Sequence, residues 1–188
     1  MKRTISLFCL ILIMGFLSGC ASTPITDGHF VRLPEGNTPV IVWGNHPAVV
    51  ETATTWLKKR GLRLFDPASL ESVLEAKSLR WEHTFEDEKN IIEAAKRLGA
   101  KEVVFANQYG DRRAPSVSVR GLNVDDNLLE WMGSARYSGF LKDPKNDMLA
   151  RLTCQALATA WGYRKPGDKW FKGSYGLCMV DEKDKGGK

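Results

Sequence analysis

The sequence predicts an α/β fold: a mixed β-sheet with two early strand–helix crossovers, a late antiparallel hairpin and a C-terminal helix packed on the sheet. Short apolar runs, such as Val40-Ile41-Val42-Trp43, alternate with segments of helical period, a pattern typical of strands covered on both faces. Residues 116–124 and 129–137 instead alternate between apolar and polar and flank the turn Asp125-Asp126-Asn127, which predicts a hairpin. The last helical pattern comes after this hairpin.

The elements can be placed from their end signals. Strands are expected at 40–43, 62–65, 103–106, 116–124 and 129–137, with 175–180 as a candidate terminal strand. Helices are expected to begin at Asn45 or His46 with Pro47, at Asp66-Pro67, at Thr84 and at Asp143-Pro144. Gly61, Gly99 and Gly162 follow helical patterns and are expected to end them. Gly121 interrupts the alternation of its strand and predicts a β-bulge.

The composition fits one globular domain. The chain has 188 residues, of which 43% are hydrophobic and 26% are charged. Its formal charge is +5, but Lys and Arg alternate with Asp and Glu, so nucleic acid is not an expected partner. The basic clusters Lys58-Lys59-Arg60 and Arg112-Arg113 are interpreted as solvated faces, with weak attraction to anionic lipid head groups as the alternative.

The first twenty residues indicate export. Lys2 and Arg3 precede an apolar run over 5–17 that is too short to span a membrane, as in a signal peptide. The run ends in Leu17-Ser18-Gly19-Cys20, which resembles the lipobox of bacterial lipoproteins. The resemblance implies cleavage before Cys20, a diacylglycerol on its thiol and an acyl chain such as palmitate on its new amino terminus. The alternative is an ordinary secretory signal with a coincidental cysteine.

This division gives four segments. Residues 1–19 are the expected lipoprotein signal peptide, and 20–37 an expected lipid-anchored tether without a sustained period. Residues 38–180 are the single α/β domain, and 181–188 form a charged tail that we expect to be disordered. Similar lipoproteins without Asp after the acylated cysteine are passed to the outer membrane, so this chain is expected at its periplasmic face.

Four features, with their order along the chain, form a known pattern. They are the strand 40–43, the phrase Leu62-Arg63-Leu64-Phe65-Asp66-Pro67-Ala68-Ser69-Leu70, the helix end Arg97-Leu98-Gly99-Ala100 before Val103-Val104, and the hairpin reaching Leu129-Glu130-Trp131. The pattern covers about 38–161 and resembles the CsgG/LpoB-like family of envelope lipoproteins, whose domain is similar to the amino-terminal domain of TolB. One departure is Asp126-Asn127, where the family often has Thr-Gly. Asn tolerates positive φ, so the exchange is mild.

Two branches of that family fit poorly. The branch of the curli secretion channel needs long membrane-crossing hairpins, and the connection 76–86 is too short and too charged to hold one. The other branch activates a penicillin-binding protein of the inner membrane. A tether of about sixteen residues spans at most about 55 Å, which is too short to present the domain there from an outer-membrane anchor.

No catalytic or metal constellation is expected. His29, His46 and His83 are scattered along the chain, and the carboxylates at 86–88 suit a helix start. Ser134 and Ser138 lack the pattern of a nucleophile elbow, and 43–47 lack the glycines of a phosphate loop. The sequence therefore predicts a non-enzymatic protein without a cofactor.

The sequence predicts that the domain binds other proteins in envelope assembly or secretion. A homo-oligomer is a candidate assembly. The candidate partner surface of the domain comprises Arg112 and Arg113, which could steer an acidic partner, and Trp170 and Phe171, which could anchor one. The structural alternatives are a solvated loop for the arginines and cover of the core edge for the aromatics. The hairpin 116–138 is expected to offer a free strand edge. The alternative function is a periplasmic small-ligand binder, or an envelope enzyme whose site one sequence does not reveal.

Acylation of Cys20 is the first prediction. Cys20→Ala should release the protein from the membrane into the soluble periplasm, because the anchor is the acylated residue itself. Fractionation of cell envelopes before and after a salt wash measures this. A Cys20→Ala protein that stays membrane-bound after the wash would show that the anchor is elsewhere.

A disulfide between Cys154 and Cys178 is the second prediction. Of the four cysteines, Cys9 is lost with the signal and Cys20 is acylated, so two are left to pair in an oxidising periplasm. Closing a loop of about 25 residues stabilises by about 3 kcal/mol in the chain-entropy model. Thiol counting on the unreduced, denatured mature protein tests the bond. Two free thiols would contradict it.

Overall fold

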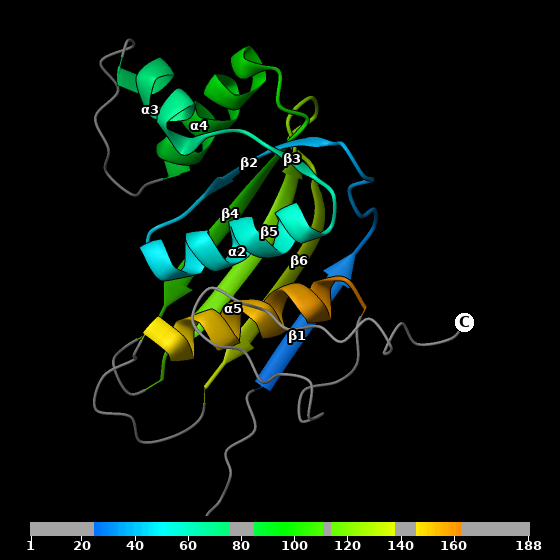
Figure 1. The fold of residues 1–188 in the computed structure, drawn as a ribbon, viewed down its shortest axis with the longest axis vertical. Helices are drawn as coiled ribbons and strands as arrows, with labels where there is room; N and C mark the ends of the chain where they lie inside the picture. The colour runs from blue at the N-terminus through cyan, green and yellow to red at the C-terminus, as the bar shows by residue number, and fades with distance from the viewer. Residues whose placement is uncertain (1–24, 76–84, 111–113, 138–145, 163–188) are drawn as a thin grey trace, which may run out of the picture.

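A computed structural model describes residues 25–75, 85–110, 114–137 and 146–162 (Figure 1). Its strands are β1 (Ile25–Phe30), β2 (Pro39–Trp43), β3 (Arg63–Leu64), β4 (Glu102–Tyr109), β5 (Ser116–Asn123) and β6 (Leu129–Arg136). Its helices are α2 (Pro47–Lys59), α3 (Pro67–Glu75), α4 (Phe85–Leu98) and α5 (Asn146–Ala160). The strands form one six-stranded sheet in the order β1-β6-β5-β4-β2-β3. The predicted fold class is confirmed.

The sheet has a parallel and an antiparallel part. β2 lies between β3 and β4 and is parallel to both, as expected for strands joined through helices. β4, β5, β6 and β1 follow as antiparallel neighbours. The predicted hairpin is β5–β6, and its register shifts at Gly121/Leu122, which confirms the bulge. Asn127 in the turn has a positive φ of 60°, which asparagine tolerates better than most other residues that carry a side chain.

The start of α2 is fixed by two polar side chains. His46 is the N-cap, and its Nδ1 accepts a hydrogen bond from the Ala48 N–H at 3.3 Å. Asn45 instead ties the start of the helix to β4, because it bonds both the N–H and the carbonyl of Gln108, at 2.8 and 2.9 Å. Of the two predicted caps, His46 is therefore the one that caps α2.

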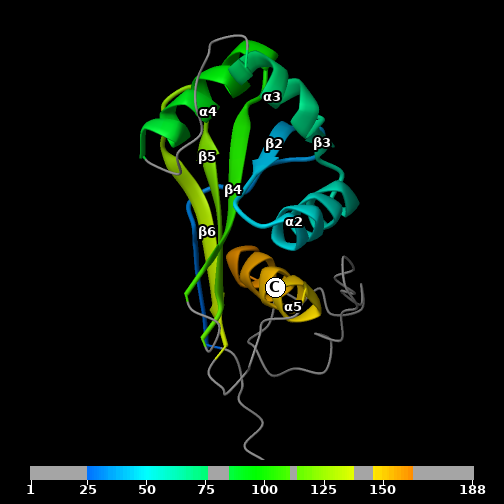
Figure 2. The same cartoon turned by 90° about the vertical axis from the view of Figure 1, so that its left-hand side faces the viewer.

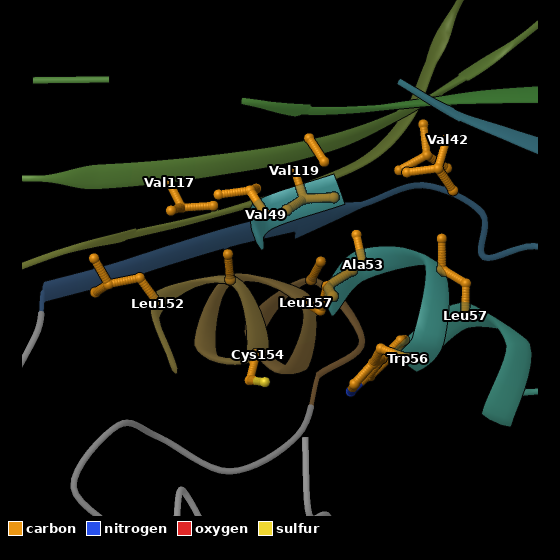
Figure 3. Packing of buried hydrophobic residues seen from close by; sticks show 14 of the residues in the cluster. Val42, Val49, Ala53, Trp56, Leu57, Val117, Val119, Leu152, Cys154 and Leu157 are labelled. Atoms are coloured by element: carbon orange, nitrogen blue, oxygen red, sulfur yellow. The ribbon is translucent and has the colours of Figure 1, made fainter. Parts of the chain in front are cut away.

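Helices cover the two faces of the sheet to different extents (Figure 2). α2 and α5 lie together on one face, whereas α3 and α4 pack on the other near β2 and β4. The core under α2 and α5 includes Val42, Val49, Ala53, Trp56, Leu57, Val117, Val119, Leu152 and Leu157 (Figure 3). The core under α3 and α4 includes Ile41, Leu70, Leu74, Ile91, Ala95, Val103 and Phe105.

Helix α5 approaches the backbone of the sheet closely. A Cβ added at Gly133 of β6 would collide with the Ala156 carbonyl, and one at Gly28 of β1 would lie 2.7 Å from the Thr159 carbonyl oxygen. Directly after α5, the Trp161 ring packs edge-on against the Trp131 ring of β6, with the ring centroids 4.5 Å apart. Glycine is therefore required at both strand positions for this helix to seat.

One expected boundary needs correction. Residues 25–30 were expected in the tether, but they form β1, which pairs along its whole length with β6 from Ile25↔Arg136 to Phe30↔Trp131. The segment has little apolar content, so its sequence lacks a strand signal, and its partner is about a hundred residues away in the chain. The sheet therefore begins at Ile25, which shortens the chain left to act as a tether.

The expected free edge of the hairpin also needs correction. β5 is covered by β4, and β6 is covered by β1. Both edges of each hairpin strand therefore pair with a neighbouring strand of the same sheet, and no edge of the hairpin is left for a partner strand. Within the described sheet, the outer strands are β1 and β3.

Candidate functional site

Among the described elements, no helix lies over most of the sheet face opposite α5, along β5, β6 and β1 (Figure 2). α4 lies over only one end of this face. Side chains that alternate with the core residues Val117, Val119, Trp131 and Ala135 project from it. We refer to this surface as the open face.

Strand register arranges the open face in three rows, because opposite residues of an antiparallel pair project on the same side. The central row is Asn107, Ser118, Ser134 and Asp27. The Arg136 row is Tyr109, Ser116, Arg136 and Ile25. The Arg120 row is Phe105, Arg120, Met132 and His29.

The rows differ in chemistry. The central row consists of small polar or acidic side chains and is bare of apolar groups. The Arg136 row has Tyr109 and Ile25 at its ends, 49% and 65% exposed, with an exposed arginine between them. The open face is therefore a small polar strip bordered by larger amphipathic groups.

Arg120 closes the end of the open face next to α4. Its guanidinium forms an ion pair with Glu88 of α4 and lies 5.2 Å from the centroid of the Phe105 ring. Both charged side chains are more than two-thirds buried, so this pair holds α4 to the sheet. Arg120 is thus a positioning group for the border of the open face.

A groove lies beside this ion pair, between α4 and the β5–β6 turn. Its volume is about 380 Å³. It is lined by Glu88, Lys89, Ile92, Glu93, Lys96, Val124, Asp125 and Asn127. Charges of both signs alternate around the apolar floor of Ile92 and Val124, so the groove has no single sign of charge to select a ligand.

The core under α5 contains a buried carboxyl group. Glu102 of β4 is 2% exposed and accepts a hydrogen bond from the indole N–H of Trp131 on β6, two strands away. Glycine at position 121 of the intervening strand makes this contact possible, since a Cβ there would collide with both groups. The missing side chain of Gly121 thus creates the space in which they meet.

Burial raises the pKa of Glu102 to about 8, and the Trp131 N–H lowers it in part. Nearby Glu130 raises it further, while Arg32 lowers it. The carboxyl is therefore mostly protonated at neutral pH. Because it is closed off from solvent, it has no access to a substrate and acts as a core polar contact.

The described residues hold no group of three or more His, Cys, Asp or Glu side chains arranged to bind a metal ion. Of the histidines, His29 lies on the open face, His46 caps α2, and His83 falls outside the described ranges. Ser134, considered above as a nucleophile, lies in the central row, with Ser118 opposite it and Asp27 on its other side.

Most of the predicted site residues fall where the structure gives no description. Cys20, Arg112, Arg113, Trp170, Phe171 and Cys178 lie outside the described residues, and so does the candidate strand 175–180. The lipid anchor and the proposed partner surface formed by these residues stay predictions. Arg112 and Arg113 belong to the connection from β4 to β5, whose strand ends carry Tyr109 and Ser116 of the Arg136 row.

Cys154 is the one predicted disulfide residue that can be placed. It lies on α5, is 6% exposed, and directs its sulfur away from the sheet (Figure 3). Its position on the outer side of α5 is compatible with a bond to the segment that follows this helix. The bond to Cys178 stays a prediction.

Sequence reasoning identified the hairpin alternation but missed the open face and the Glu102–Trp131 contact. The alternation of Ser116 and Ser118 with two valines indicated one polar side. The signal for Glu102 was a carboxylate directly before the apolar run 103–106, where its neighbours are buried. Which strands lie beside each other could not be read from these local patterns.

No helix in the described part of the chain is long and apolar enough to cross a membrane.

The chain is similar to known proteins in three-dimensional structure, whereas sequence comparison finds no match. No protein-family model and no curated protein matches the chain. The LpoB C-terminal domain from Salmonella enterica is 17% identical, covering 56% of this chain and 85% of that domain, with a TM-score of 0.47. A PelC dodecamer from Paraburkholderia phytofirmans is 11% identical, covering 76% of this chain and 99% of that one, with a TM-score of 0.45. Lipoprotein GNA1162 from Neisseria meningitidis is 16% identical, covering 61% and 90%, also with a TM-score of 0.45.

LpoB C-terminal domains are thus among the structures to which this chain is similar. Membership of the CsgG/LpoB-like family stays a prediction. The identities are too low to assign a role to any residue of this chain.

The third prediction concerns the buried carboxyl group of Glu102. A carboxyl whose pKa is about 8 when folded and 4.5 as a model group binds more protons in the folded state, so stability falls as pH rises between these values. Glu102→Gln keeps an oxygen for the Trp131 N–H but does not titrate. We expect the free energy of unfolding of the wild type to drop from pH 5 to pH 8.5 by on the order of 2 kcal/mol or more relative to this variant.

Urea unfolding followed by tryptophan fluorescence across this pH range measures the effect. Glu71→Gln, at an exposed position of α3, is the matched control and should follow the wild type. Parallel stability curves for Glu102→Gln and the wild type would contradict the assignment of a protonated buried carboxyl.

Proposed function

We propose that this chain is a non-catalytic lipoprotein of the outer membrane that binds a protein partner in envelope assembly or secretion. In this proposal the acylated Cys20 holds it at the periplasmic face of that membrane, and the domain from Ile25 onward presents the binding surface. The open face is the observation that carries the proposal.

The chemistry of the open face suits a protein partner. Non-obligate protein interfaces are about as polar as ordinary surface, and their strongest contacts come from tyrosine, tryptophan and arginine. The Arg136 row supplies an exposed tyrosine and an exposed arginine, with the small serine Ser116 between them. The side chains of the central row beside it are short, so a partner side chain can approach the sheet backbone there. This combination of anchors and a flat floor supports binding of a folded surface.

The shape of the face favours binding over catalysis. Enzyme sites enclose a substrate and exclude water, whereas the open face is a sheet surface bordered by α4 on one end. Its residues are spread in rows over β4, β5, β6 and β1.

The alternative of a small-ligand binder rests on the groove beside α4. Its volume of about 380 Å³ is within the range of ligand pockets. The mixed charges and the apolar floor of Ile92 and Val124 fit an amphipathic, zwitterionic ligand better than a simple anion or cation. Loss of function on Ile92→Trp, with partner capture through the open face intact, would favour this alternative.

The fourth prediction tests the open face as the binding surface. Ser134→Arg places a long side chain in the middle of the central row, and we expect it to lower capture of the partner by about tenfold or more, a cost of at least about 1.4 kcal/mol. Capture is measured by crosslinking in intact envelopes, followed by pull-down of the full chain and mass spectrometry. Thermal stability should change little, because the Ser134 side chain lies on the accessible side of the sheet.

Ser72→Arg is the matched control, since Ser72 is an exposed serine of α3 away from the open face. It should capture the partner as the wild type does. Normal capture by Ser134→Arg would show that the open face is not the binding surface. Turnover of a cell-wall or lipid substrate by the purified protein, lost on changing one residue, would overturn the non-enzymatic proposal itself.

A further inference from the structure

The outer edge of β1 is a candidate site for a second strand. β1 is the last strand of the sheet, and no described strand pairs with its outer side. An edge of this kind presents backbone N–H and carbonyl groups that an added strand can bond. The inner side is fully engaged, since β1 pairs with β6 over six positions.

The hydrogen bonds to β6 determine which groups point outward. The Val31 N–H donates to the Glu130 carbonyl at 2.7 Å, so Val31 is directed inward. Backbone direction alternates along an antiparallel strand. The N–H and carbonyl groups of Thr26, Gly28 and Phe30 are therefore the ones that point outward.

Large apolar side chains are exposed at both ends of β1. Ile25, Phe30 and Val31 are 65%, 50% and 75% exposed, and each lies within or directly after β1. Two polar residues, Asp27 and His29, lie between them on the open face. Edge strands that stay single are usually protected by lysine or proline, and β1 has neither within Ile25–Phe30; its one carboxylate is Asp27.

We propose that β1 pairs antiparallel with β1 of a second copy of this chain, with Gly28 of the two copies opposite each other. Every outward N–H and carbonyl of Thr26, Gly28 and Phe30 then finds a partner, because Thr26 of one copy faces Phe30 of the other. Asp27 faces His29 across the seam twice, so a carboxylate accepts from an imidazole N–H at each place. Ile25 faces Val31 twice and covers the exposed apolar surface.

Other registers are poorer. Moving the second strand by two residues in one direction sets Asp27 against Asp27, and in the other direction it sets His29 against His29. In the first case two carboxylates repel each other, and in both cases Asp27 loses the imidazole N–H that it meets in the proposed register. A shift by one residue brings inward-directed backbone groups to the seam and leaves outward ones unpaired. The proposed register is the one in which charge, apolar area and backbone groups all agree.

The pairing joins two sheets into one. The two-fold axis passes through the Gly28 pair perpendicular to the sheet, so the open faces of both copies lie on the same side. The self-association is independent of the proposed partner: a failure of the β1 seam leaves the partner test on Ser134 and Ser72 intact, and a failure of that test leaves the seam intact.

Cysteine pairing tests the register. Asp27→Cys and His29→Cys are made separately in the full chain carrying Cys20→Ala, so that no lipid or micelle brings copies together. Directly opposite positions of an antiparallel pair meet the distance required for a disulfide. Under mild oxidation we expect a mixture of the two variants to crosslink at least about fivefold more than either variant alone.

The Cys20→Ala chain without new cysteines controls for the native ones. Crosslinking of one variant with itself at the level of the mixture would overturn the register. No crosslinking in the mixture would overturn the seam, as would a sedimentation coefficient that stays that of a monomer at every protein concentration.

Sedimentation of two lysine variants tests the contacts. Val31→Lys should lower the association constant about tenfold, because it places a charge against Ile25 at both ends of the seam. Leu128→Lys, at an equally prominent residue of the β5–β6 turn that is 62% exposed, is the matched control and should leave association unchanged. Equal association of the two variants would overturn the proposal.

A charge exchange completes the test. His29→Asp alone sets carboxylates against each other and should weaken association about tenfold, whereas Asp27→His with His29→Asp restores opposite partners and should recover most of it. A double variant as weak as the single one would overturn the proposed pairing of Asp27 with His29.

Discussion

The seating of α5 on bare strand backbone is the constraint on which the rest of the arrangement depends. Gly133 and Gly28 leave no side chain between this helix and strands β6 and β1, so the helix sits directly on the sheet. The close approach lets Trp161 reach the ring of Trp131 and join α5 to the core under α2. Because α5 and α2 occupy one face, and α3 and α4 cover only part of the other, the open face follows from how the helices are distributed.

The same core contains a polar contact that costs stability at high pH. Glu102 and Trp131 meet across β5 only because the bulged position between them is Gly121. A neutral carboxyl satisfies the indole N–H and needs no counter-charge, so the protonated form suits the buried site. The contact links strands β4 and β6 across their shared neighbour and fixes the bulge at a defined place in the hairpin.

Two surfaces with different chemistry meet at β1. Its open-face side chains Asp27 and His29 end the central and Arg120 rows. Its outer edge has no described strand beside it, and the exposed Ile25 and Val31 lie at its two ends. A sheet surface recognises the shape and side chains of a partner, whereas a strand edge recognises backbone and register. The fold therefore offers one surface suited to a different protein and one suited to a copy of itself.

The sequence by itself determined the fold class, the core strands, the glycines that follow α2, α4 and α5, and the Gly121 bulge. Apolar period and helix-ending residues act over a few neighbours. It also indicated a polar side on the hairpin through its serines. Only the tertiary structure decided that 25–30 is a strand, that β6 is covered, and that Glu102 meets Trp131. These features depend on pairing between segments far apart in the chain, and local residue patterns hold no information about which distant strand will supply the missing hydrogen bonds.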